Sequence, residues 1–118
     1  MSLPFKYDLT YYDGETLLES FVCEDAYGNP TDLTGYEAKM QVRESATDES
    51  DTPLLELSTD NGGIVIDYEL GRISLHHASL GTSMSGFYDL VLIDGSGVKT
   101  WFISPKSKFK VLESVTHV

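Results

Sequence analysis

Eight consecutive residues in the first half of the chain alternate strictly between apolar and polar side chains. Residues 36–43 read YEAKMQVR, in which Tyr36, Ala38, Met40 and Val42 alternate with four polar or charged residues. A period of two places the two sets on opposite faces of a β-strand, whereas a helix would scatter the apolar groups around its axis. The segment therefore predicts a strand with one face on a hydrophobic core and the other in water.

Other strand-like runs follow, separated by turns that contain Gly, Asn, Asp or Pro. We expect further strands at residues 5–12, 16–23, 54–58, 64–66, 72–75, 87–93, 98–104 and 106–115. Asp13-Gly14 predicts a hairpin between the first two, and the turn at 94–97 predicts another. Residues 76–85 are the one stretch for which a helical turn is an alternative.

About eight to nine short strands at these spacings, without a strand–helix–strand rhythm, predict an all-β fold. The expected architecture is an antiparallel β-sandwich. The length of 118 residues suits a single domain over residues 1–118. Residues 44–53 read ESATDESDTP and cannot bury apolar surface, so we expect an acidic loop there.

The charge of the chain excludes several classes of partner. Its 19 acidic and 8 basic residues give a net charge of −11, which disfavours binding to nucleic acid or to an anionic membrane.

The first residues do not resemble a signal peptide, and no apolar stretch is long enough to span a bilayer. With one cysteine there is no intrachain disulfide, and Cys23 is expected to be a buried small hydrophobe.

Motifs for catalysis, cofactors and metals are missing from the sequence. There is no glycine-rich phosphate loop and no Gly-x-Ser-x-Gly elbow. The acidic stretches 25–32 and 48–51 do not fit an EF-hand loop, and the adjacent His76 and His77 point to opposite faces of an extended chain. We therefore expect no enzyme, no cofactor and no metal site.

Residues 87–93 are apolar on both faces, which indicates a strand that is central or covered by a partner. Tyr88, Leu90 and Leu92 form one face. Alternation also predicts that Trp101 shares a face with Lys99 and Ile103 and is partly exposed or in an interface. Together with Phe5 in the N-terminal arm, the candidate interface residues are Phe5, Phe87, Val91, Ile93 and Trp101.

Aromatic side chains suggest a second hypothesis. A platform of such rings can stack on sugars, as in carbohydrate-binding β-sandwiches, but the same residues can equally serve core and cross-strand packing. The residues concerned are Tyr7, Tyr11, Tyr12, Tyr27, Tyr68 and Trp101.

Several short sequence motifs occur in a characteristic order along the chain. They are DLTGY at 32–36, MQVR at 40–43, LST at 57–59, NGGI at 61–64, GRISL at 71–75, GFYDL at 86–90, DGSG at 94–97 and VT at 115–116. This order resembles the N-terminal domain of baseplate upper proteins of tailed bacteriophages and prophages, and related fibre-anchoring modules. The resemblance extends over most of the chain.

The resemblance implies an immunoglobulin-like sandwich that attaches to a tail, baseplate or neck and holds or neighbours a fibre. It implies no catalytic residues. Such domains often continue into a fibre, whereas this sequence stops at Val118, so the expectation is a small accessory structural protein of a virion. Its expected partners are other virion proteins and copies of itself. The alternative is a carbohydrate-binding module engaged in host-surface recognition.

Overall fold

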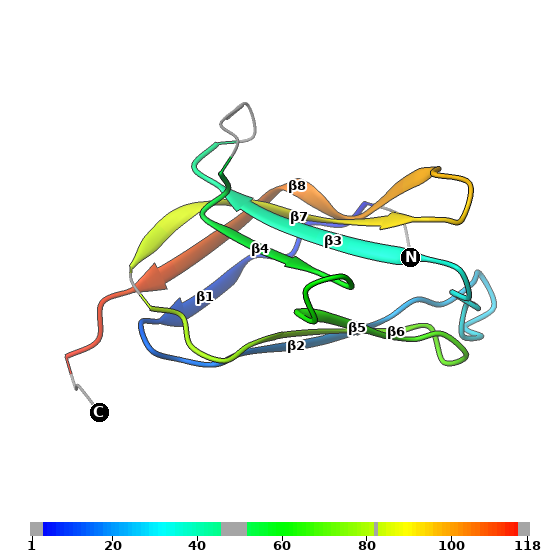
Figure 1. The fold of residues 1–118 in the computed structure, drawn as a ribbon, viewed down its shortest axis with the longest axis horizontal. Coiled ribbons are helices and arrows are strands. Elements are labelled where there is room, and N and C mark those ends of the chain that lie inside the picture. Colours follow the sequence, from blue (N-terminus) through cyan, green and yellow to red (C-terminus); the bar gives the residue numbers. More distant parts are fainter. Residues whose placement is uncertain (1–3, 46–51, 82, 116–118) are drawn as a thin grey trace.

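The protein is an all-β sandwich of two sheets that pack face to face (Figure 1). The computed structural model describes residues 4–45, 52–81 and 83–115. Within these ranges it contains eight strands and no helix, and hence no helix that is long and apolar enough to cross a membrane. The strands are β1 Leu9–Tyr12, β2 Leu17–Val22, β3 Glu37–Arg43, β4 Leu55–Ser58, β5 Ile64–Asp67, β6 Arg72–His77, β7 Met84–Ile93 and β8 Lys99–Leu112.

The larger sheet has five strands in the order β1-β8-β7-β3-β4, and the smaller has three in the order β2-β6-β5. Neighbouring strands are antiparallel except β1 and β8, which are parallel. The sequence prediction of an eight- to nine-stranded sandwich is confirmed. The expected hairpin at Asp13-Gly14 is wrong, because β1 pairs with β8 while β2 pairs with β6 in the other sheet. The turn there carries the chain from one sheet to the other.

The hairpin predicted at residues 94–97 is present and joins β7 to β8. The Oδ1 atom of Asp94 accepts hydrogen bonds from the backbone N–H groups of Ser96 and Val98, at 2.8 and 2.9 Å. Gly97 has a φ of 84°, a conformation that favours glycine. These contacts fix the turn and start β8 in register with β7.

β8 is a single long strand with an irregularity at its centre, where two strands were expected on either side of Pro105. Its pairing with β7 shifts between Tyr88 and Leu90, and again between Leu90 and Val91. Proline lacks a backbone donor and is tolerated in a strand at such a bulge. The shift turns both Phe102 and Ile103 into the core, so the prediction that Ile103 shares the face of Trp101 is wrong.

The helical alternative for residues 76–85 is also wrong. β6 continues to His77 because His76 and His77 pair with Leu18 and Leu17 of β2. The following loop is fastened by Leu80, which is buried and whose N–H donates to the carbonyl of Glu15 at 3.0 Å. Burial of Leu80 and its hydrogen bond thus hold this connection in a non-helical path.

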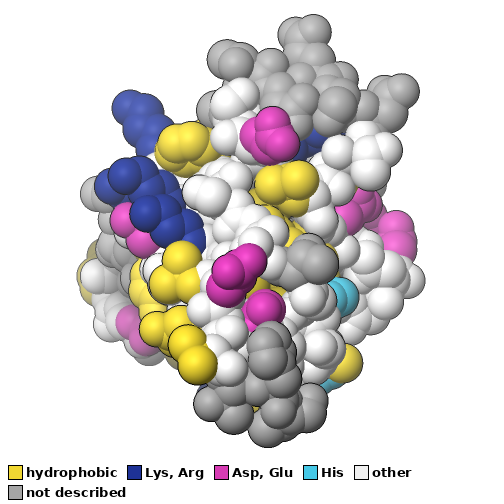
Figure 2. Space-filling view, turned by 90° about the vertical axis from the view of Figure 1, so that its left-hand side faces the viewer, with side chains coloured by type: hydrophobic (Ala, Val, Ile, Leu, Met, Phe, Trp, Pro, Cys, Tyr) yellow, Lys and Arg dark blue, Asp and Glu magenta, His cyan; other side chains and the backbone are white. Residues whose placement is uncertain are grey.

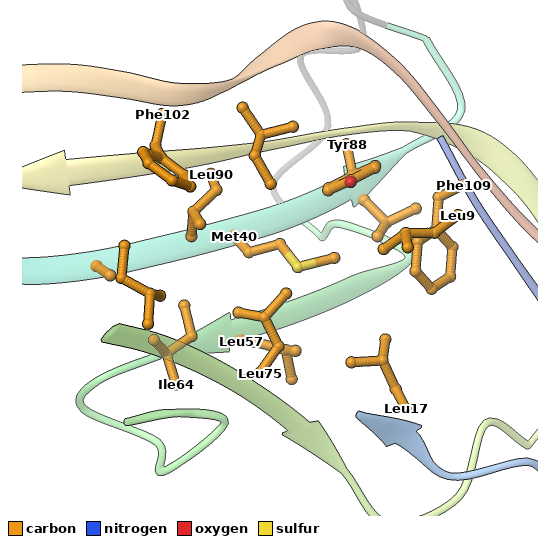
Figure 3. Packing of buried hydrophobic residues seen from close by; sticks show 14 of the residues in the cluster. Leu9, Leu17, Met40, Leu57, Ile64, Leu75, Tyr88, Leu90, Phe102 and Phe109 are labelled. Carbon is orange, nitrogen blue, oxygen red and sulfur yellow. The ribbon is translucent and has the colours of Figure 1, made fainter. Parts of the chain in front are cut away.

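The hydrophobic core lies between the sheets. Figure 3 shows Met40, Tyr88 and Leu90 of the larger sheet facing Leu17 and Leu75 of the smaller one. Cys23 is buried in this core as predicted, and burial raises the pKa of its thiol to about 11. The acidic loop expected at 44–53 falls largely on residues 46–51, which lie outside the described residues.

Hydrogen bonds of buried tyrosines reinforce this packing. The hydroxyl of Tyr11 in β1 donates to Oε1 of Glu19 in β2 at 2.9 Å, and thereby joins the two sheets. The hydroxyl of Tyr88 donates to the backbone carbonyl of Tyr7. Burial raises the pKa of both phenols above the ordinary value, so both remain protonated donors at neutral pH.

Candidate interaction face

The outward side of the five-stranded sheet presents a continuous surface across four strands, which we term the outer face. It exists because alternate residues of β3 and β7, such as Met40 and Leu90, point into the core and their neighbours point away. The outer face consists of Lys39, Gln41, Arg43, Glu56, Phe87, Asp89, Val91, Ile93, Lys99 and Trp101.

The structure brings four of the five predicted interface residues together on this face. Phe87, Val91 and Ile93 lie on the outward side of β7, each half-buried, with Asp89 between Phe87 and Val91. Trp101 is the cross-strand partner of Val91 and is 40% exposed. The apolar side chains therefore form one row along β7 with the indole beside its centre.

Phe5 lies apart from the outer face, in a cluster of aromatic rings that packs against the edge of the hydrophobic core. Its ring packs edge-on against Phe102 at a centroid distance of 5.0 Å and against Phe21 of the smaller sheet at 6.2 Å. The carbonyl of Phe5 accepts a hydrogen bond from the N–H of Ser104 at 2.8 Å. The N-terminal arm is thus fastened along β8, and Phe5 closes the sandwich instead of extending from it.

Polar contacts link the side chains of the outer face across strands. The indole Nε1–H of Trp101 donates to Oδ2 of Asp89 at 2.9 Å. Nε2 of Gln41 donates to Oε2 of Glu56 at 3.0 Å, and Nη2 of Arg43 donates to Oε1 of Gln41 at 3.0 Å. Contacts of this kind, exposed for Trp101 and partly buried for Gln41, add little stability, but they fix side-chain positions before a partner arrives.

The outer face is hollowed in three places. The central hollow, of about 280 Å³, is lined by Asp89, Val91 and Trp101 together with polar neighbours. A second, of about 390 Å³, lies between β3 and β4 and includes Glu37, Glu56 and Ile93. A third, of about 170 Å³, lies beside Phe87 and Pro105. These three hollows leave space for side chains of a partner protein to pack into the outer face.

Basic residues gather on the larger sheet although the chain is strongly acidic. Of the 8 Lys and Arg residues, six lie on β3 and β8: Lys39, Arg43, Lys99, Lys106, Lys108 and Lys110. The last three alternate with buried residues and so point outward. Figure 2 views the end of the molecule that lies on the left in Figure 1. Lys and Arg side chains gather there at the upper left, with acidic and hydrophobic side chains next to them. Within the outer face itself, Lys39, Arg43 and Lys99 outnumber Glu56 and Asp89, so this face is less acidic than the molecule as a whole.

Asp89 is the titratable group most affected by the geometry of this face. Burial raises its pKa above the ordinary value of 3.8, while the hydrogen bond from Trp101 and the charge of Arg43 partly offset the increase. A raised carboxyl pKa means that folding favours the protonated form. The contribution of Asp89 to stability is therefore greatest at low pH, and is lost as the pH rises from below 3.8 through the raised pKa.

We expect the fluorescence of Trp101 to report this titration, because it is the protein's single tryptophan and its indole bonds the titrating carboxyl. The fluorescence should change with pH around a midpoint above 3.8. Asp89→Asn should abolish this transition and flatten the corresponding part of the stability–pH curve. A midpoint at or below the ordinary value in the wild-type protein would contradict the buried environment of Asp89.

The six aromatic residues proposed as a sugar platform do not lie together. Tyr11 is buried, and Tyr12 pairs with Leu112 at the far end of β8 from Trp101. Tyr27 and Tyr68 lie in the loops after β2 and β5, and Tyr7 packs against Phe21. Trp101 alone of the six belongs to the outer face.

Sequence reasoning did not identify Asp89, Gln41 and Glu56 as parts of the site. Alternation shows that Gln41 points outward, but its contact with Glu56 depends on the register between β3 and β4. The contact of Asp89 with Trp101 depends on the irregular pairing of β7 and β8. Cross-strand register thus assembles the site.

Among the described residues, no group of three or more His, Cys, Asp and Glu side chains is arranged to hold a metal ion. No family model and no curated protein matches this sequence.

Proposed function

We propose that this chain is an assembly module of a tailed bacteriophage or prophage virion, which binds other virion proteins or further copies of itself through the outer face. The supporting observation is the hollowed surface on which Val91, Ile93 and Trp101 are surrounded by hydrogen-bonded polar side chains. An apolar centre with a polar rim is the usual anatomy of a protein–protein interface, and tryptophan is enriched among the residues that dominate binding energy.

The strand order supports the immunoglobulin-like part of the proposal. In immunoglobulin sandwiches, strands C, F and G form one sheet, with C′ added in variable domains, and strands B, E and D lie in the other. Here β3, β7 and β8 share a sheet with β4, while β2, β6 and β5 form the second. This correspondence supports an immunoglobulin-like sandwich, which is the fold that the resemblance to phage fibre-anchoring domains implies.

Incorporation into particles tests the proposal most directly. We expect the wild-type protein in purified virions by mass spectrometry. Val91→Lys should deplete it at least about tenfold, because a charge at the centre of the interface must be desolvated on binding. Val91 points outward and is half-buried, so the free protein should fold normally, as checked by its thermal unfolding curve.

Val65→Lys is the matched control. Val65 is also an outward-facing valine in mid-strand, but it lies on β5 of the smaller sheet and is 61% exposed. This variant should be incorporated like the wild type. Absence of the wild-type protein from purified virions would contradict the phage assignment. Normal incorporation of Val91→Lys would show that assembly uses a surface other than the outer face.

One feature favours carbohydrate binding as a second candidate function. Trp101 borders a hollow that also contains Asp89, Gln41, Lys39 and Lys99, and an aromatic ring beside hydrogen-bonding groups suits a sugar. On a glycan array, loss of binding in Trp101→Ala with retention in Tyr12→Ala would support this function. Failure of the wild-type protein to bind any glycan would remove it.

A further inference from the structure

A separate pocket opens between β7 and β8 of the larger sheet and the segment that joins β2 to β3, on the opposite side of β8 from Trp101. It lies at the end of the sandwich where the segment joining β2 to β3 crosses from one sheet to the other (Figure 1). The pocket has a volume of about 150 Å³. Its lining residues are Cys23, Glu24, Thr31, Leu33, Tyr36, Leu92, Thr100 and Phe102.

The inner wall of this pocket is apolar. Cys23, Leu33, Leu92 and Phe102 are all buried members of the hydrophobic core. Among the described residues there is no buried side-chain nitrogen or oxygen that lacks a hydrogen-bond partner. The polar side chains of the lining, Glu24, Thr31, Tyr36 and Thr100, are exposed or half-buried and form the outer part of the pocket. The inner part therefore favours an apolar group over a water molecule, which needs about two to four polar partners.

The pocket is also held open by backbone contacts. The N–H of Thr31 donates to the carbonyl of Cys23 at 2.9 Å, and the N–H of Leu33 donates to the carbonyl of Tyr68 at 2.9 Å. Gly71 allows this close packing, since a Cβ atom there would lie 2.9 Å from the carbonyl oxygen of Cys23. The wall contributed by residues 31–33 is thus fixed before any ligand binds, which lowers the entropic cost of binding.

Size and polarity together define the ligand. An apolar cavity of about 150 Å³ in a protein core is large enough to bind benzene. At the mouth, the exposed Glu24 and Thr100 leave the pocket accessible from solvent. We infer that this pocket is a binding site for one small apolar ring of benzene size. The inference does not depend on the proposed function, because it involves neither the outer face nor a virion partner.

Benzene itself is the probe, titrated into the intact chain with isotope-labelled leucine methyl groups. We expect saturable NMR shifts at Leu33 and Leu92, which line the pocket. Leu18 should not shift, because it is 64% exposed on the outside of the smaller sheet. Absence of saturation, or equal shifts at Leu18, would overturn the inference.

Two substitutions at the mouth distinguish the pocket from general hydrophobic adsorption. Thr100→Phe places a ring across the opening and should weaken benzene binding at least about tenfold. Thr100→Val has nearly the shape of threonine and should leave the affinity unchanged. Phenylalanine and valine are both favoured in β-strands, and position 100 is exposed, so neither substitution should disturb the packing of the hydrophobic core. Wild-type affinity in Thr100→Phe would contradict the assigned location.

Protection of Cys23 provides a readout in the wild-type protein, without any substitution. Cys23 is the single cysteine and lines the pocket, so a methanethiosulfonate reagent labels one known position. Saturating benzene should slow this labelling at least about tenfold, since reagent and ligand compete for the same space. An unchanged labelling rate would overturn the inference even if Thr100→Phe fails to fold.

Discussion

Replacing Gly86 with alanine should destabilise the protein by about 3 kcal/mol or more, at the upper end of the range for overpacked sites. Gly86 is buried in β7, and the backbone at the end of the neighbouring strand β3 approaches it closely. A Cβ atom at this position would overlap the carbonyl oxygen of Arg43 and lie 2.9 Å from its carbonyl carbon. Because these are backbone atoms, no side-chain rotation relieves the overlap, and β3 must separate from β7.

Urea denaturation gives the free energy of unfolding that checks this expectation. Gly81→Ala is the matched control, because Gly81 is exposed and a Cβ atom there would have nothing within 4 Å. We expect the control to change stability by no more than about 0.5 kcal/mol. Equal stabilities of the two variants would mean that β3 and β7 do not approach as closely as described.

The strands that could be predicted from sequence are those whose environment is local and regular. β3 alternates because one side faces the core and the other faces water, and its predicted and observed positions agree within one residue. Apolar residues on both faces predict β7, and its inner row of Tyr88, Leu90 and Leu92 is buried as expected. In both strands the period of two follows directly from backbone geometry.

The errors arose where partners distant in the sequence decide the structure. Asp13-Gly14 is a good hairpin turn, yet β1 pairs with β8, about 100 residues away, since Leu9 aligns with Phe109. The position of Ile103 was wrong because the pairing of β7 with β8 shifts next to it. Local patterns contain no information on which of several compatible strands becomes the neighbour.

Consecutive residues of β8 serve the two proposed sites separately. Trp101 points to the outer face, while Thr100 and Phe102 on either side of it line the apolar pocket. Alternation along one strand therefore supplies both surfaces, and the strand backbone separates them. As a consequence, Val91→Lys should leave benzene binding intact, and Thr100→Phe should leave the outer face intact.

Truncation of Phe109 to alanine should cost about 3–5 kcal/mol of unfolding free energy, as expected for loss of a buried aromatic ring. Phe109 is completely buried in β8, and its ring lies 5.9 Å from that of Tyr88 and 6.3 Å from that of Tyr11, measured between centroids. It therefore joins the packing of β1, β7 and β8. Since small domains are stable by about 5–15 kcal/mol, the variant should melt at a much lower temperature.

Leu112→Ala on the same strand separates loss of core packing from loss of strand propensity. Leu112 is 43% exposed and pairs with Tyr12 at the end of β8. Its truncation should cost less than about 1 kcal/mol, because most of the side chain is already in contact with water. If the two truncations cost the same, the ring of Phe109 does not pack as described. A large excess for Phe109→Ala would instead support the packing of this ring against both β7 and β1, including the parallel β1–β8 pair that no local sequence pattern indicated.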